Sequence, residues 1–94
     1  MSEEHYDLTL NKESLTNYLI DATKRYFIKK GFEGEESLIA NESYIKDIKD
    51  IDDVASLALA ARYLANELDD QITIKMKATF TDVTGKRRTG YRVI

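Results

Sequence analysis

Ten residues near the end of the chain, 72–81, decide the fold: Ile-Thr-Ile-Lys-Met-Lys-Ala-Thr-Phe-Thr. Apolar and polar side chains alternate here without a break, which is typical of a strand with one buried face and one solvated face. A second alternating stretch follows at 88–93, and Gly85 between the two is free to adopt a positive φ in a turn. The sequence therefore predicts that the last quarter of the chain forms an antiparallel hairpin.

The register of this hairpin is predicted by matching its apolar side chains, because a shift of one residue would move every side chain to the opposite face. The apolar sets align when the directly opposite pairs are Phe80–Thr89, Ala78–Tyr91 and Met76–Val93. This register also places Asp82 opposite Arg87, an opposite-charge pair worth about 0.2–1 kcal/mol. We therefore expect one apolar face and one cationic face. The basic residues expected on the cationic face and near its tip are Lys75, Lys77, Lys86, Arg87, Arg88 and Arg92.

Two long helices are predicted ahead of the hairpin. Residues 12–30 carry apolar side chains at spacings of three and four, with Asn11 as the N-cap and Gly31 as the residue that ends the helix. Residues 51–69 carry an unbroken apolar stripe that is rich in alanine and leucine, the strongest helix formers. Small side chains on this stripe would let a neighbouring element approach closely. They are Ala58, Ala61 and Ala65.

The segment between the two long helices is ambiguous. Residues 38–40 suit either a short strand or a helical turn, whereas the apolar spacing within 42–49 favours a short helix. Asp50 or Asp52 can then cap the helix that follows. Near the N-terminus, residues 6–10 alternate with period two and can add a third strand.

Together these elements predict a single α+β domain over residues 1–94, in the order β-α-α-α-β-β. Two long helices and a short helix are expected to pack on one face of the C-terminal hairpin, because a lone hairpin is only marginally stable in water. Residues 1–5 are expected to form a flexible tail. The sequence contains no internal repeat, low-complexity tract or linker.

The composition argues against an enzyme. Cysteine is absent and His5 is the only histidine, so the usual pairs of nucleophile and base are missing. No phosphate loop or metal-ligand spacing is present, so neither a cofactor nor a metal is expected. No apolar run approaches the ~18–20 residues that span a bilayer, and the lack of cysteine fits a cytoplasmic protein without a membrane segment.

Charge is distributed unevenly along the chain. Residues 1–70 hold 8 basic and 16 acidic residues, whereas residues 71–94 hold 6 basic residues and one acidic residue. Such asymmetry can mark contact surfaces of opposite sign, or regions that attract each other. The acidic residues that we expect at the surface are Glu33, Glu35, Glu36, Asp50, Asp52 and Asp53.

Three functions remain open on this basis. The first is a small non-enzymatic module that binds a protein partner, including a second copy of itself, through the hairpin, whose sheet would have open edges. The second is a nucleic-acid binder that uses the basic face, although in the expected register Phe80 and Tyr91 lie on the other face and cannot stack on bases. The third is an inhibitor of the phage-encoded type that presents the acidic surface to a basic target.

Overall fold

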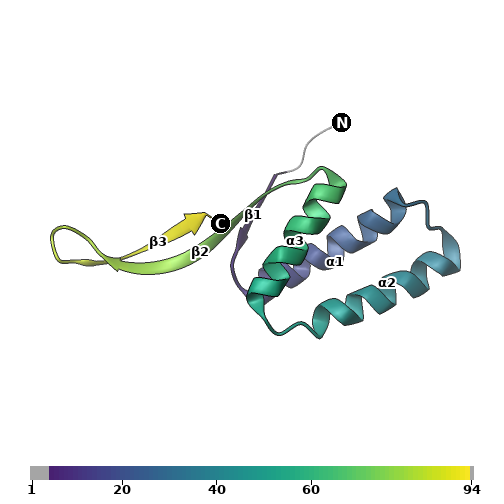
Figure 1. Ribbon diagram of the computed structural model, residues 1–94, viewed down its shortest axis with the longest axis horizontal. Helices are drawn as coiled ribbons and strands as arrows, with labels where there is room; N and C mark the ends of the chain where they lie inside the picture. Colours follow the sequence, from purple (N-terminus) through teal and green to yellow (C-terminus); the bar gives the residue numbers. More distant parts are fainter. Residues whose placement is uncertain (1–4, 94) are drawn as a thin grey trace.

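The computed structural model describes residues 5–93 and contains three helices and a three-stranded mixed sheet in the predicted order, which confirms the α+β class. The elements are β1 (His5–Thr9), α1 (Lys12–Lys29), α2 (Gly34–Lys49), α3 (Val54–Leu68), β2 (Gln71–Thr81) and β3 (Arg87–Val93). The helices gather at one end and the β2–β3 hairpin projects from them, so the molecule measures 59 × 32 × 14 Å (Figure 1). Of the expected tail, residues 1–4 lie outside the described residues, and His5 already belongs to β1.

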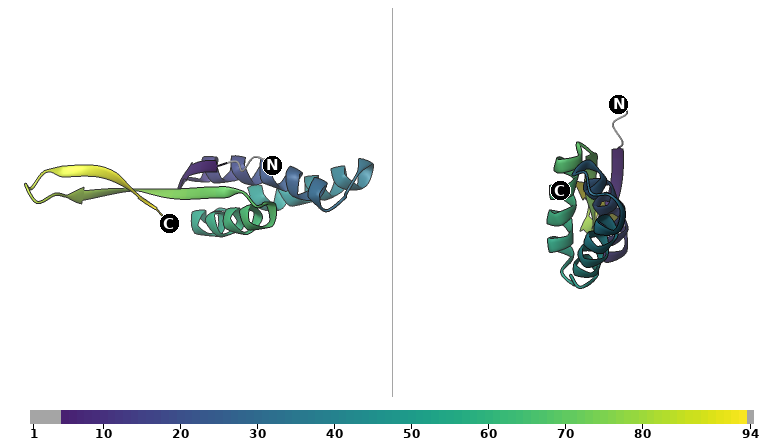
Figure 2. Two further views of the ribbon diagram at one scale, coloured as in Figure 1. Left: turned by 90° about the horizontal axis from the view of Figure 1, so that it is seen from above. Right: turned by 90° about the vertical axis from the view of Figure 1, so that its right-hand side faces the viewer.

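The long strand β2 is the centre of the sheet, and its two halves have different neighbours. Its first half pairs in parallel with β1, from His5 opposite Gln71 to Thr9 opposite Lys75. Its second half pairs in antiparallel with β3, which begins near the tip with Arg87 opposite Thr81 and ends with Val93 opposite the same Lys75. Figure 2 shows from above that this second half continues past the helices. The helices therefore cover only the first half of β2, whereas the sequence led us to expect cover along the whole apolar face.

The ends of the helices are set by local hydrogen bonds and backbone conformation. Asn11 caps α1 as predicted, and its side chain accepts a hydrogen bond from the Ser14 N–H at 2.8 Å. Gly31 follows the end of α1 with a φ of 84°, a value that glycine adopts without strain. The cap of α3 is Asp53, whose side chain accepts from the Ala55 N–H, so the prediction of Asp50 or Asp52 was wrong by one to three residues.

Helix α2 is much longer than the predicted 42–49. Its first half carries Leu38 and Ile39, which are 59% and 61% exposed, so this half has no buried stripe that a periodicity could reveal. The second half packs on α1, where Ile48 is buried and the ring of Tyr44 lies 5.7 Å from that of Phe27 in an edge-to-face contact.

The core lies between α1, α3 and the first half of the sheet. Leucines on the two helices meet Leu8 of β1 and Ile74 of β2, and all of them are buried. Ala61 of α3 is fully buried, as the small face of this helix predicted, and its short side chain lets α1 and α3 pack closely. The fully buried leucines are Leu15, Leu19, Leu57 and Leu64.

A polar cluster ties the start of β2 to α1. The Asp70 carboxylate accepts a hydrogen bond from the Tyr18 hydroxyl at 2.7 Å and another from the Arg25 guanidinium at 2.9 Å. The Asp70 side chain is only 8% exposed, so both donors compensate for the water that the carboxylate loses. The guanidinium also lies 5.6 Å from the centre of the Tyr6 ring. The cluster fixes the direction in which β2, and therefore the hairpin, leaves the helices.

Candidate functional site: the projecting hairpin

The register of the hairpin differs by one residue from the predicted one. Phe80 lies opposite Arg88, Ala78 opposite Gly90 and Met76 opposite Arg92. The turn explains the difference: the Asp82 N–H donates to the Lys86 carbonyl oxygen at 2.9 Å, which leaves a three-residue loop that ends in Gly85 with a φ of 83°. Three-residue loops with a left-handed last residue are a common hairpin connection. The geometry of the turn therefore sets the register, and matching the apolar side chains gave a wrong prediction.

This register mixes apolar and basic side chains on both faces, because directly opposite residues share a face. We call the two faces the Phe80 face and the Tyr91 face. The Phe80 face of the paired strands carries Met76, Ala78, Phe80, Arg88, Gly90 and Arg92. The Tyr91 face carries Lys75, Lys77, Thr79, Thr81, Arg87, Thr89, Tyr91 and Val93. The expected separation into one apolar and one cationic face was therefore wrong.

Large apolar side chains on the hairpin are exposed to solvent. Phe80 is 51% exposed, Tyr91 60% and Val93 71%, and Val83 in the turn is fully exposed. Met76 and Ala78, nearer the helices, are partly buried. Exposure thus increases along β2 toward the tip, where no helix of the described chain covers the strands.

Four of the six predicted basic residues form no ion pair with residues 5–93. Lys75 is paired with Asp7 at 3.2 Å, and Arg88 is paired with Asp82. The four that lack such a partner are Lys77, Lys86, Arg87 and Arg92. They surround the tip and both faces, so the projecting part of the hairpin has a strongly positive field.

Asp82 organises the tip. Its carboxylate accepts hydrogen bonds from the Thr84 N–H at 2.9 Å, the Thr84 hydroxyl at 2.6 Å and the Lys86 N–H at 3.0 Å, and it also accepts from Nε of Arg88. The hydrogen bonds from Thr84, followed by that from Arg88, hold the pKa of Asp82 below its ordinary value. The predicted pairing of Asp82 with Arg87 was wrong, because the shifted register brings Arg88 to it instead.

The hairpin leaves backbone groups unpaired along the edge of β2. The N–H and C=O groups of successive residues in a strand point to opposite edges. The Lys75 carbonyl accepts from the Leu10 N–H on the β1 side, and the chain then turns away into α1. The backbone groups of Lys77, Thr79 and Thr81 must therefore point to the same side, where residues 5–93 place no strand. We call this stretch, residues 77–81, the open edge of β2.

The predicted acidic surface is divided between the two ends of α2. Glu33, Glu35 and Glu36 lie at its N-terminal end, while the three aspartates follow its C-terminal end. A helix of 16 residues separates them by about 24 Å. Two of the aspartates also have structural partners, because Asp52 pairs with Lys12 at 2.9 Å and Asp53 caps α3. The acidic residues therefore form two separate groups.

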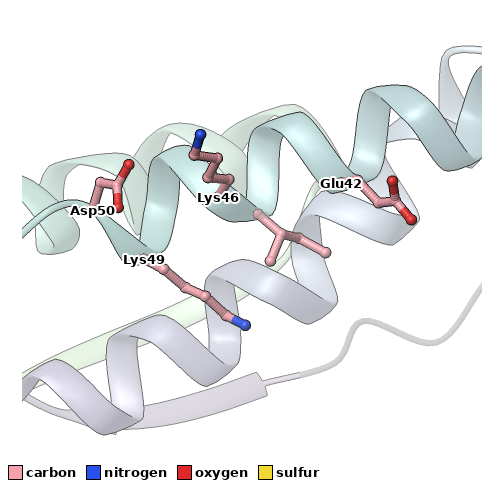
Figure 3. A pocket seen from close by; sticks show the side chains of 5 residues that line it. Glu42, Lys46, Lys49 and Asp50 are labelled. Carbon is pink, nitrogen blue, oxygen red and sulfur yellow. The ribbon is translucent and has the colours of Figure 1, made fainter.

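Hollows lined by residues within 5–93 lie on the helices. One, of about 400 Å³, is lined entirely from α2 and its C-cap, by Glu42, Ile45, Lys46, Lys49 and Asp50. Its labelled charged side chains point in different directions and do not converge on a common point (Figure 3). Another hollow, of about 280 Å³, is mostly apolar and lies between the end of β1 and α3; we call it the Leu10 hollow. It is lined by Leu10, Ala55, Ala58, Leu59 and Arg62.

The described residues offer neither a metal cluster nor a membrane helix. Within residues 5–93, no three His, Asp or Glu side chains lie close enough to hold a metal ion. In the same part of the chain, no helix has both the length and the apolarity needed to cross a bilayer. Comparisons with protein-family models, curated proteins and solved structures give no match. The exposed apolar side chains, unpaired basic residues and open edge of the projecting hairpin make it the candidate contact element.

Proposed function

We propose that this chain is a non-enzymatic protein-binding module that contacts another polypeptide through the projecting part of the hairpin, residues 76–93. The observation that supports this most strongly is the lack of cover: Phe80, Tyr91 and Val93 are more than half exposed on strands that extend beyond the helices. A two-stranded ribbon with exposed apolar side chains is only marginally stable by itself in water. Contact with another polypeptide would bury these side chains.

The open edges of the hairpin suggest how a partner would bind. Unpaired backbone groups along a strand are a template for another strand, and addition of a strand is a common mode of peptide recognition. The charge of the hairpin would then help to select the partner, since residues 76–93 hold five basic residues and one acidic residue. Such a field speeds association with acidic surfaces.

The proposal is tested by comparing two surface variants of the full chain in affinity capture from a native lysate, with and without nuclease treatment. The Phe80→Ser/Tyr91→Ser variant should lose the proteins that the wild-type chain captures. The Leu38→Ser/Ile39→Ser variant removes similarly exposed apolar side chains from α2 and should retain them. Equal capture by both variants, or capture that disappears on nuclease treatment, would argue against a protein-binding hairpin.

Nucleic-acid binding is a second candidate, and the observed register favours it more than the predicted register did. Tyr91 lies opposite Lys77 on one face, and Phe80 lies opposite Arg88 on the other, so each exposed ring is next to a cation. Rings that stack on bases, together with cations that contact phosphates, are typical of single-strand binding. Fluorescence anisotropy with a labelled single strand should then show binding that weakens steeply with salt. Absence of binding at low salt would eliminate this candidate.

A further inference from the structure

Resting on the proposed function, we propose that the polypeptide bound by the hairpin is a second copy of this chain, paired in antiparallel along the open edge of β2 about a twofold axis at Thr79. The two hairpins would then form one four-stranded sheet in the order β3-β2-β2-β3. Each copy would cover the part of β2 that β1 is too short to reach.

The backbone groups of the open edge suit this arrangement. Lys77, Thr79 and Thr81 all point their N–H and C=O groups to the open side, and Thr79 is the middle of the three. A twofold axis at Thr79 places Thr79 opposite itself, and Lys77 opposite Thr81 of the second copy. Each such pair exchanges two hydrogen bonds, so the interface would contain roughly six. The pairing stops at Lys75, whose carbonyl already accepts from Leu10.

The side chains also fit this axis. On the Phe80 face, Phe80 of one copy would lie opposite Ala78 of the other, so that a large side chain meets a small one. On the Tyr91 face, Lys77 would lie opposite Thr81, so no two like charges are directly opposed. Both faces of the β2 edge are therefore compatible with self-pairing about Thr79.

The inference is tested by a single cysteine at the axis, because the chain has no cysteine of its own. Cα atoms of a hydrogen-bonded antiparallel pair are about 5.5 Å apart, within the range that a disulfide spans. Thr79→Cys should therefore oxidise to a covalent dimer in high yield. Thr89→Cys is the matched control, because Thr89 lies opposite Thr79 on the same face but belongs to β3. Equal cross-linking of both variants would overturn the inference.

A proline at the same positions supplies a second test, measured by sedimentation equilibrium. The Thr79 N–H points to the open edge, so Thr79→Pro removes no hydrogen bond within the hairpin but should weaken dimerisation at least tenfold. Thr89→Pro removes the corresponding outward N–H from β3 and should leave the dimer intact. Circular dichroism checks that both variants fold.

These results separate the inference from the proposed function. A wild-type chain that stays monomeric at millimolar concentration would overturn the inference. If that monomer still captured other proteins only through an intact Phe80 and Tyr91, the proposed function would stand with a different partner. If the monomer captured none, both would fail. A dimer whose mass is unaffected by Thr79→Pro would overturn pairing at this edge.

Discussion

The ring of Phe80 covers Gly90 across the hairpin, so that a β-carbon at Gly90 would lie only 3.0 Å from Cε1 of the ring. The two residues are diagonal neighbours on the Phe80 face, because Phe80 lies opposite Arg88 and Ala78 opposite Gly90. The lack of a side chain at Gly90 is what leaves room for the ring at this position. Gly90 therefore sets the position of the largest exposed apolar side chain on this face.

A methyl group at Gly90 should displace the Phe80 ring without unfolding the hairpin. In Gly90→Ala, the ring can swing outward because it is half exposed, and the replaced glycine was itself unfavourable in a strand. We expect the free energy of unfolding to change by less than about 1 kcal/mol. Chemical shifts of the Phe80 ring protons in NMR spectra should change clearly. Unchanged shifts would show that the ring does not lie on Gly90 in solution.

Removal of the charge at Asp70 should destabilise the whole domain. In Asp70→Asn, the partly buried Arg25 guanidinium loses the carboxylate that it pairs with, and we expect a loss of about 2–3 kcal/mol in the free energy of unfolding. Urea denaturation measures this change. The control is Asp69→Asn, at a residue with a φ of 58°, where asparagine is well tolerated and the aspartate side chain is 85% exposed. Equal losses in both variants would contradict a specific role for Asp70.

The buried hydroxyl of Tyr18 should make the domain sensitive to alkaline pH. Burial, and then the hydrogen bond to Asp70, raise the pKa of Tyr18 above its ordinary value of 10.0. The unfolded chain therefore releases this proton near pH 10 while the folded chain retains it. The stabilisation is complete below pH 10 and is lost as the pH rises above it. Urea denaturation of Tyr18→Phe should show a shallower decline above pH 10, whereas Tyr91→Phe should follow the wild type.

Protonation of Asp82 should loosen the tip before the core responds. The pKa of Asp82 is lowered in the folded chain. Its ionised carboxylate therefore stabilises the tip at pH values above the ordinary pKa of 3.8, and this stabilisation is lost as the pH falls below that value. The protection factors of the Thr84 and Lys86 amides, which compare each exchange rate with the intrinsic rate at the same pH, should fall between pH 5 and pH 2. In Asp82→Ala, both amides should lack protection at every pH, while the buried Leu64 amide keeps its protection. Equal loss of protection in the core would contradict this local role.

Much of the fold could be predicted from the sequence because local patterns encode it. The N-cap Asn11 and Gly31 just beyond the C-cap bound α1, and the apolar stripe of α3 and the alternation in 72–81 each determine an element by its period. The first half of α2 could not be found in this way, because Leu38 and Ile39 are exposed and leave no buried stripe. This segment is nevertheless helical, because α2 as a whole packs beside α1. The sequence pattern does not show that α1 is its neighbour.

The candidate site depended on features that only the tertiary structure decided. The alternation in 72–81 determined that successive side chains point to opposite faces, but the hydrogen bonds of the turn at Asp82 and Gly85 decided which residues of β3 they meet. Likewise, a period of two indicates which side chains could be buried and not what covers them. What covers a strand depends on the lengths of elements that are distant from it in sequence. Here β1 stops beside Lys75 and the helices reach no farther along β2, so Phe80 stays exposed to solvent.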